Sequence, residues 1–292
     1  MTARLLALSL VFSSGCTYIH DTRGSSVQVV AGDAAPIDGI STLTHVMWTD
    51  VLEAFASDEG VDYDALIADQ EHRYILDQYL GLLAAVDPRE LDDRDEKLAF
   101  YVNLYNAAVV QGVVDRLEET SDFRVDQDGF EFFDAPLVEL QGRLLSLNVL
   151  EHALIRGDEG HVSASEAALD DEGRELTREL HDDLWSAEPF DPRVHFVLNC
   201  ASRSCPPLQV TALRGEGLDQ TLEAAASSFL LDPDRGAGPN GISRLFEWFT
   251  SDFANAGWAE PADFIAEYRA LDDVDVTRYL TYDWALNRWS AP

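Results

Sequence analysis

The longest periodic segment of the chain runs from residue 88 to residue 117 and constrains the fold more than any other feature. Its apolar residues recur at spacings of three, four and seven, which is typical of a helix with one buried face. They are Leu91, Leu98, Val102, Tyr105, Val109, Val113 and Leu117. The pattern predicts a central helix around which the other elements pack.

Two amides, Asn103 and Asn106, lie three residues apart on this predicted helix, in an apolar neighbourhood. A buried amide costs a few kcal/mol unless it is hydrogen-bonded. We therefore expect each amide either to meet the backbone of a neighbouring loop or to position a residue of a binding site. Both are candidate substrate-binding residues.

The remaining patterns predict several further helices and a few short strands. Helical stripes cover residues 44–55, 61–83, 145–156, 218–231, 245–253 and 261–271, and alternation predicts strands at 130–133 and 138–145. The sequence thus predicts an α+β fold, a predominantly helical single domain with a small β-sheet over residues 41–290. Residues 157–190 are acidic and predict a surface insertion in that domain.

The stretch from Asp191 to Leu208 is the densest in reactive side chains. Residues 194–198 are apolar and β-branched enough to predict a short buried strand that contains His195. Small residues and prolines then predict a loop that carries the C-x4-C pair Cys200 and Cys205. Three polar residues of this stretch are further candidates for substrate binding: Asn199, Ser202 and Arg203.

Glu151 and His152 lie in the predicted helix 145–156. Glu151 stands three residues after Asn148, a capping-box spacing, so it either caps the helix or serves a site. His152 is either a core histidine satisfied by a carbonyl or a side chain that faces the loop at Cys200.

The first residues resemble a bacterial lipoprotein signal. Residues 1–15 hold one basic residue, an apolar core and small residues before Cys16, although Ser13 stands where that pattern usually has Leu. We expect residues 1–15 to be a signal peptide, Cys16 to carry lipid, and residues 16–40 to form a tether. The chain would then be secreted across the inner membrane and anchored in the outer membrane, facing the periplasm.

Charge and location limit the partners. A formal net charge of −34 repels nucleic acid, so no nucleic-acid partner is expected. In an oxidising compartment the even pair Cys200 and Cys205 can form a disulfide or remain as free thiols. The spacing of these cysteines is at the edge of what structural zinc sites show, and we expect no metal and no cofactor.

Five pieces of the sequence together resemble the "domain of unknown function 547" family. They are the stretches 99–107, 145–152, 191–208, 248–253 and 282–287. The family motif positions fall here on Asn103, Asn106, Glu151, His152, His195, Asn199, Cys200, Ser202, Cys205, Asp252 and Asp283. The family is largely uncharacterised, so the resemblance implies relatives and little mechanism.

Two functions remain open. The first is a binding or assembly module of the cell envelope, in which a disulfide pins the loop and polar residues hold a glycan or a peptide. The alternative is a thiol hydrolase or acyltransferase with Cys200 or Cys205 as nucleophile and His152 or His195 as base. Because side chains alternate along a strand, the predicted strand separates His195 from Cys200 and favours His152 as the base. Arg203 could help to lower the pKa of the thiol.

Overall fold

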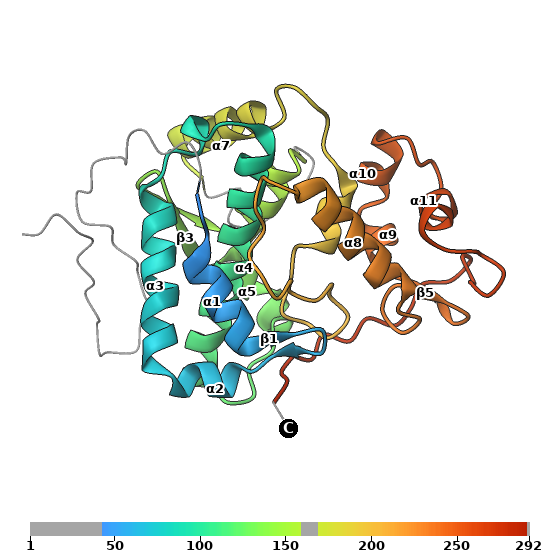
Figure 1. Cartoon of the computed structure of the whole chain (residues 1–292), viewed down its shortest axis with the longest axis horizontal. Helices are drawn as coiled ribbons and strands as arrows, with labels where there is room; N and C mark the ends of the chain where they lie inside the picture. Colours follow the sequence, from blue (N-terminus) through green and yellow to red (C-terminus); the bar gives the residue numbers. More distant parts are fainter. Residues whose placement is uncertain (1–42, 159–168, 291–292) are drawn as a thin grey trace, which may run out of the picture.

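The computed structural model describes residues 43–158 and 169–290, and helix α4 (Arg94–Glu119) runs through its middle (Figure 1). Asp93 caps α4 by accepting a hydrogen bond from the Glu96 amide, and 19 of the 26 helical residues are buried. The predicted central helix is confirmed, but it begins later than expected. Pro88–Glu90 forms a separate helical turn, η1, capped by Asp87.

The N-terminal helices pack against α4 on one side. They are α1 (Val46–Phe55), α2 (Tyr63–Ala68) and α3 (Gln70–Ala85). The predicted helix 61–83 is two helices, because Asp69 ends α2 and its carboxylate accepts hydrogen bonds from the Glu71 and His72 amides that begin α3. The α1 and α3 helices lie side by side on the left of Figure 1.

The strands form three two-stranded antiparallel hairpins and no larger sheet within the described residues. These are β1 (Ala56–Ser57) with β2 (Gly60–Val61), β3 (Pro136–Leu140) with β4 (Arg143–Ser146), and β5 (Ala237–Gly238) with β6 (Gly241–Ile242). The prediction of a strand at 130–133 is wrong, since Glu131–Asp134 forms the short helix α5. Phe132 and Phe133 are both buried, whereas a strand with one face towards solvent would expose one of them.

The C-terminal half is a second group of helices, drawn in yellow to red in Figure 1. The predicted helix 218–231 is confirmed as α8 (Leu218–Leu231), which packs on η4 (Pro192–Phe196) and α11. The other helices of this group are α9 (Leu245–Trp248), α10 (Thr250–Asn255) and α11 (Pro261–Tyr268). Helix α7 (Asp171–Leu184) packs instead on η1, η3 and α4. The predicted fold class, a predominantly helical α+β single domain, is confirmed.

A C-terminal segment, residues 282–288, ties the two halves together. The Asn287 amide donates to the Ala201 carbonyl (3.0 Å), and the Asn287 carbonyl accepts from the Val61 amide (2.8 Å). Leu286 forms a bridge with Ser202. The segment therefore lies between the N-terminal hairpin and the cysteine loop.

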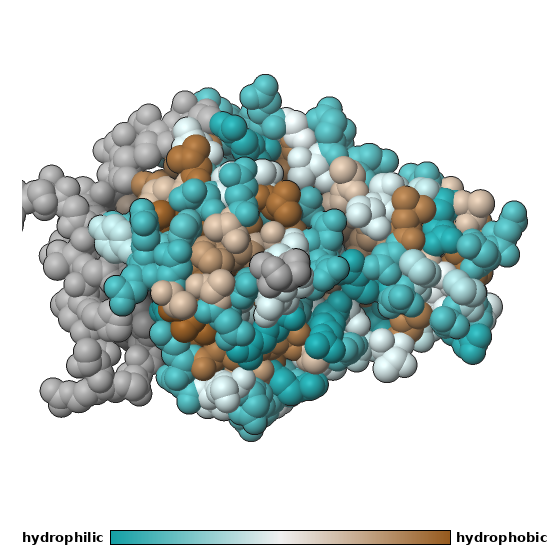
Figure 2. Space-filling model, turned by 60° about the horizontal axis from the view of Figure 1, so that its bottom comes forward, coloured by the Kyte–Doolittle hydropathy of each residue, from teal (hydrophilic) through white to brown (hydrophobic). Residues whose placement is uncertain are grey.

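Hydrophilic residues cover most of the face in Figure 2, with smaller hydrophobic patches between them. Among residues 43–158 and 169–290, no helix is both long and apolar enough to cross a membrane. The predicted signal peptide, the lipidated Cys16, the tether at 16–40 and residues 159–168 of the predicted insertion lie outside the described residues. The described part of that insertion includes α7, which packs on α4 and buries Leu180 and Leu184.

The Asn106 side chain connects α4 to the backbone that leads into the cysteine loop, and substituting it tests how much this connection stabilises the fold. Its Nδ2 donates to the Val197 carbonyl (2.8 Å), and its Oδ1 accepts from the Asn199 amide (2.9 Å), all at buried positions. Asn106→Ala would leave both backbone groups unpaired. We expect the free energy of unfolding, measured by urea denaturation, to fall by about 3 kcal/mol.

Asn255→Ala is the matched control, because Asn255 is an exposed residue at the end of α10. It should change the free energy of unfolding by less than about 0.5 kcal/mol. Equal effects of the two substitutions would refute the structural role of Asn106.

Candidate active site

The segment that delivers the cysteines is a helical turn, and the prediction of a strand at 194–198 is wrong. Pro192 begins η4 and the Asp191 carboxylate caps it by accepting from the Arg193 amide (2.9 Å). Proline at the first position of a helix after an Asp cap is a helix-start signal, and it prevails over the apolar run. The alternation that separated His195 from Cys200 therefore does not apply, and both line one pocket.

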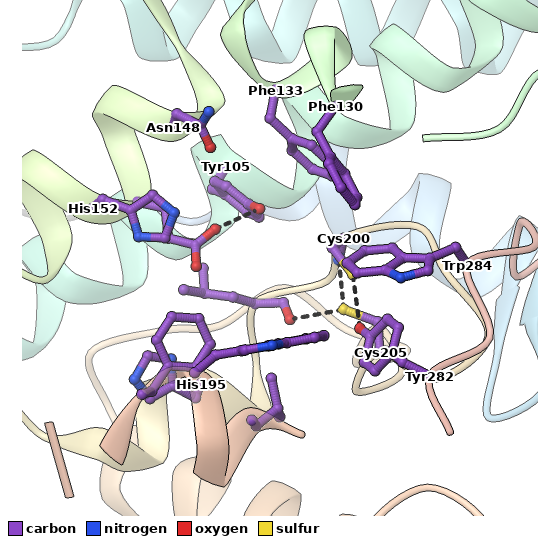
Figure 3. Close-up of a pocket in the computed structure, with 15 residues that line it drawn as sticks. Tyr105, Phe130, Phe133, Asn148, His152, His195, Cys200, Cys205, Tyr282 and Trp284 are labelled. Atoms are coloured by element: carbon purple, nitrogen blue, oxygen red, sulfur yellow. Dashed lines mark hydrogen bonds between the residues drawn. The ribbon is translucent and has the colours of Figure 1, made fainter. Parts of the chain in front are cut away.

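This pocket has a volume of about 320 Å³ and lies between the two halves of the molecule (Figure 3). Its walls come from α4, α5, the π-helix η3 (Val149–Ile155), η4, the cysteine loop, α9 and the C-terminal segment. The lining residues are Tyr105, Phe130, Phe133, Asn148, Glu151, His152, His195, Leu198, Cys200, Cys205, Leu245, Trp248, Phe249, Tyr282 and Trp284. All five candidate catalytic residues line it: Glu151 and His152 come from η3, His195 from η4, and Cys200 and Cys205 from the loop that follows η4.

One wall carries the thiols. Of the two states that the sequence left open, the structure has free thiols at Cys200 and Cys205. The Cys200 sulfur lies 3.2 Å from both Ser202 Oγ and Tyr282 Oη, and the Cys200 amide donates to the Cys205 sulfur (2.8 Å). Cys200 is partly exposed, whereas Cys205 is buried.

The two thiols differ in acidity. Burial opposes ionisation of Cys200, but hydrogen bonds from the Cys205 thiol, Ser202 and Tyr282 outweigh it and lower the pKa of Cys200. Burial and the hydrogen bond with Cys200 raise the pKa of Cys205 well above its ordinary value. Cys200 is therefore the thiol that ionises first.

The opposite wall carries a carboxylate and two histidines. Glu151 Oε2 accepts a hydrogen bond from Tyr105 Oη (2.8 Å). Glu151 and His152 both line the pocket although they are neighbours in sequence, because the wider turn of a π-helix reduces the angle between consecutive side chains. Such single π-turns are frequent at functional sites. Burial opposes ionisation of Glu151, yet the Tyr105 hydrogen bond and the nearby charge of Arg156 lower its pKa.

An ion-paired chain behind this wall connects the two histidines. His195 Nε2 lies 2.8 Å from Asp252 Oδ2, which also accepts from Arg156 Nε (2.7 Å). Arg156 Nη2 reaches Asp252 Oδ1 (3.1 Å), and Arg156 Nη1 lies 2.7 Å from His152 Nδ1. Phe249 stacks on the His195 ring, with the centroids 4.0 Å apart.

This chain assigns the protonation of both rings. A guanidinium only donates, so His152 Nδ1 must accept from Arg156, and His152 is neutral with its proton on Nε2. Hydrogen bonds from His195 and Arg156 lower the pKa of Asp252 despite its burial, so Asp252 is ionised and His195 carries a proton on Nε2. Burial lowers the pKa of His195, which leaves Nδ1 deprotonated. His195 Nδ1 has no hydrogen-bond partner within the described residues. His195 therefore offers a lone pair, whereas His152 offers a donor.

The two walls face each other across the pocket. In Figure 3 the histidines lie on one side and Cys200, Cys205 and Tyr282 on the other. Within residues 43–158 and 169–290, no group of three His, Cys, Asp or Glu side chains is arranged to hold a metal ion. A reaction here must involve a substrate that reaches from the thiol to the carboxylate and histidine wall.

The predicted substrate-binding residues mostly hold the backbone. Asn103 pairs with both the amide and the carbonyl of Leu213. Asn199 donates to the Pro206 carbonyl (2.6 Å) and accepts from the Ala201 amide. Ser202 contacts the Cys200 sulfur, and Arg203 is exposed, 3.7 Å from Asp283. Asn106 and Asn199 thus hold the backbone of the cysteine loop, and Asn103 holds that of Leu213. Neither Ser202 nor Arg203 is among the residues that line the pocket.

Several residues of the site were not predicted from the sequence. They include Tyr105, Arg156 and Tyr282. Tyr282 and Asp252 belong to the short stretches that carried the family resemblance, which was the available signal. Arg156 stands four residues after His152, one helical turn away, but nothing in the pattern pointed to its partner Asp252.

The fold and the site define a helical α+β protein with a thiol and a carboxylate–histidine cluster in one pocket. Residues 88–230, just under half of the chain, match the family described as "Protein of unknown function, DUF547". The match supports assigning this segment to the domain of unknown function 547 family, an uncharacterised family. No curated protein and no solved structure matches the chain.

The lowered pKa of Cys200 predicts selective alkylation. The thiolate is the reactive form, so iodoacetamide should label Cys200 at pH 7 while the protein is folded, and Cys205 far more slowly. Tyr282→Phe removes a donor, raises the pKa of Cys200 and should slow labelling at pH 7 about tenfold, with the difference vanishing above the new pKa. Peptide mass spectrometry over pH 5–10 measures both rates.

Tyr279→Phe is the control, since Tyr279 is an exposed tyrosine three residues away and does not line the pocket. Labelling of both cysteines only after reduction would contradict the prediction and indicate a disulfide.

Proposed function

We propose that the protein is a thiol hydrolase or acyltransferase in which Cys200 is the nucleophile. The observation that carries the proposal is the Cys200 thiol itself, partly exposed in a pocket and held by hydrogen-bond donors that lower its pKa. A lowered thiol pKa in a partly exposed setting is typical of reactive cysteines. Structural cysteines are buried and have a raised pKa, as Cys205 has.

In the proposed reaction, one wall of the pocket supplies the nucleophile and the other supplies the groups that transfer protons. The Cys200 thiol gives its proton to the neutral His195 at Nδ1, which makes the imidazolium. The Cys200 thiolate attacks the acyl carbon, a carbon–sulfur bond forms, and the bond to the leaving group breaks with its electron pair going to the leaving atom. The leaving atom takes a proton from the His195 imidazolium, which Asp252 stabilises. Water or an acceptor alcohol or amine then gives a proton to His195 Nδ1 and attacks the thioester, which returns Cys200 as thiolate.

The other residues of the second wall orient this chemistry. The Nε2 proton of His152, fixed by Arg156, is a donor for a substrate oxygen. Glu151 remains ionised and held by Tyr105, so it can accept a hydrogen bond from the attacking water or amine. Of the two bases that the sequence left open, these hydrogen bonds favour His195.

A binding module of the cell envelope, for a glycan or a peptide, is the second candidate. Its support is the separation of the walls, because His195 Nε2 pairs with Asp252 while the Cys200 thiol pairs with Ser202 and Tyr282. In that case Cys200 contacts a ligand without attacking it.

A burst experiment with p-nitrophenyl acetate tests the proposal. p-Nitrophenol leaves without needing a proton, so wild type should release one equivalent rapidly, with an acetyl group on the Cys200 peptide by mass spectrometry. Cys200→Ser should abolish the burst. His195→Asn should keep the burst but slow the subsequent turnover by about 10²- to 10⁴-fold.

His72→Asn, at a histidine on α3 outside the pocket, is the control and should change neither phase. An unchanged burst in Cys200→Ser would reject the enzyme and leave the binding module.

We also propose that the chain is an envelope lipoprotein anchored through Cys16, which the apolar core of residues 1–15 and the small residues before Cys16 support. Expressed in a bacterial host with labelled palmitate, the full chain should incorporate label into the outer-membrane fraction. Cys16→Ala should abolish incorporation, and Cys200→Ala should not. Equal labelling of all three would contradict the anchor.

A further inference from the structure

Four aromatic rings form one cluster at the pocket, on the side of the thiols. Trp284 lies at the centre of this aromatic cluster, with its ring centroid 4.3 Å from Tyr282, 4.7 Å from Phe130 and 5.7 Å from Trp248. Phe130 is 37% and Trp248 41% exposed, although both line the pocket. Large apolar side chains that remain exposed beside a pocket are typical of a ligand-binding surface.

The aromatic cluster is continuous with the nucleophile. Tyr282 packs its ring on Trp284 and holds its hydroxyl 3.2 Å from the Cys200 sulfur. Figure 3 shows Phe130 and Trp284 beside Cys200, on the side of the pocket away from the histidines. A group bonded to the Cys200 sulfur would therefore lie against these rings, while its leaving group faces Glu151 and His195.

The charges around the pocket decide which group fits. None of the described residues that line it is Lys or Arg, both histidines are neutral by their hydrogen bonds, and Glu151 is ionised. The nearby Arg156 is paired with Asp252. A carboxylate buried in this pocket would lose its hydration with no cation to replace it, which is costly. An uncharged apolar group meets no such cost.

We propose that the aromatic cluster is the acyl subsite of the enzyme, and that its substrates are esters, thioesters or amides of uncharged, apolar acids. This inference rests on the proposed function and names the substrate class for it. Phe130 lies within the family match at 88–230, whereas Trp248, Tyr282 and Trp284 lie outside it. The chemistry-bearing residues Glu151, His195 and Cys200 all lie within it.

The selectivity of Cys200 acylation tests the subsite. The burst rate constant should rise along p-nitrophenyl acetate, butyrate and hexanoate by up to about fourfold per added methylene, the factor for burying one such group. The mono-p-nitrophenyl ester of succinic acid should react at least tenfold more slowly than the butyrate ester. A succinate ester as fast as the butyrate ester would overturn the proposal.

Two variants remove rings without touching the thiol contacts. Trp284→Ala should lower the hexanoate-to-acetate ratio of the burst rate constants at least tenfold. Phe130→Asn should lower the ratio in the same direction, and Asn is well suited to the left-handed backbone at this position (φ 68°), so this variant should fold. Tyr74→Ala, at an exposed tyrosine outside the pocket, is the control and should leave the ratio unchanged.

A binding measurement separates this inference from the proposed function. Calorimetric titration of the Cys200→Ser variant with hexanamide, butyramide and acetamide should show affinity rising with chain length, and Phe130→Asn in the same background should remove the trend. If this trend appears but wild type gives no burst, the proposed acyl subsite is supported and the proposed hydrolase activity is rejected. If wild type gives a burst of equal rate with all three esters and no amide binds, the hydrolase stands and the subsite is wrong.

Discussion

The two hydrogen bonds of the Asn106 amide hold the backbone that leads into Cys200, and the rest of the site depends on them. They join α4, in which 19 of 26 residues are buried, to the carbonyl of Val197 and to the amide of Asn199 two residues further along the chain. Because α4 is fixed by apolar contacts along its whole length, its amide fixes the loop in turn. The cysteines on that loop thereby acquire a defined position relative to η3, which also packs on α4.

The two walls of the pocket carry different reactive groups, and each wall depends on a different local backbone structure. The carboxylate and histidine wall depends on a π-turn, which brings two consecutive side chains, Glu151 and His152, to the same pocket. The thiol wall depends on a loop with a left-handed residue, Ala201 (φ 59°), directly after Cys200. Neither conformation is favoured by its sequence in isolation, and both are held by neighbours buried in the core.

The parts of the fold that the sequence predicted are those where one residue period persists. The apolar stripes of α4 and α8 extend over several turns, so the pattern fits a helix and does not fit a strand. The runs at 130–133 and 194–198 are too short for periodicity to distinguish strand from helix. At the first, Phe130 turns the chain in a left-handed conformation, and at the second, Asp191 and Pro192 start a helical turn.

The candidate site, too, could be predicted from the sequence only in part. Cys200, His195, Glu151 and His152 could be selected from the sequence because their side chains are reactive in any setting. Their roles could not, because the partners that decide them are distant in the chain: Asp252 is 57 residues from His195, and Asp252 is 96 residues from Arg156. Pairings of this kind arise only from tertiary structure. The protonation of the two histidines, which assigns base and donor, follows from those pairings alone.

The hydrogen bond from Tyr282 to Cys200 also has a consequence for biosynthesis. Cys200 is made 82 residues before the hydroxyl that helps to acidify it. While the nascent chain lacks those residues, Cys200 has one donor fewer and is a weaker acid. The thiol thus reaches its full acidity only when the C-terminal segment that carries Tyr282 has completed the pocket.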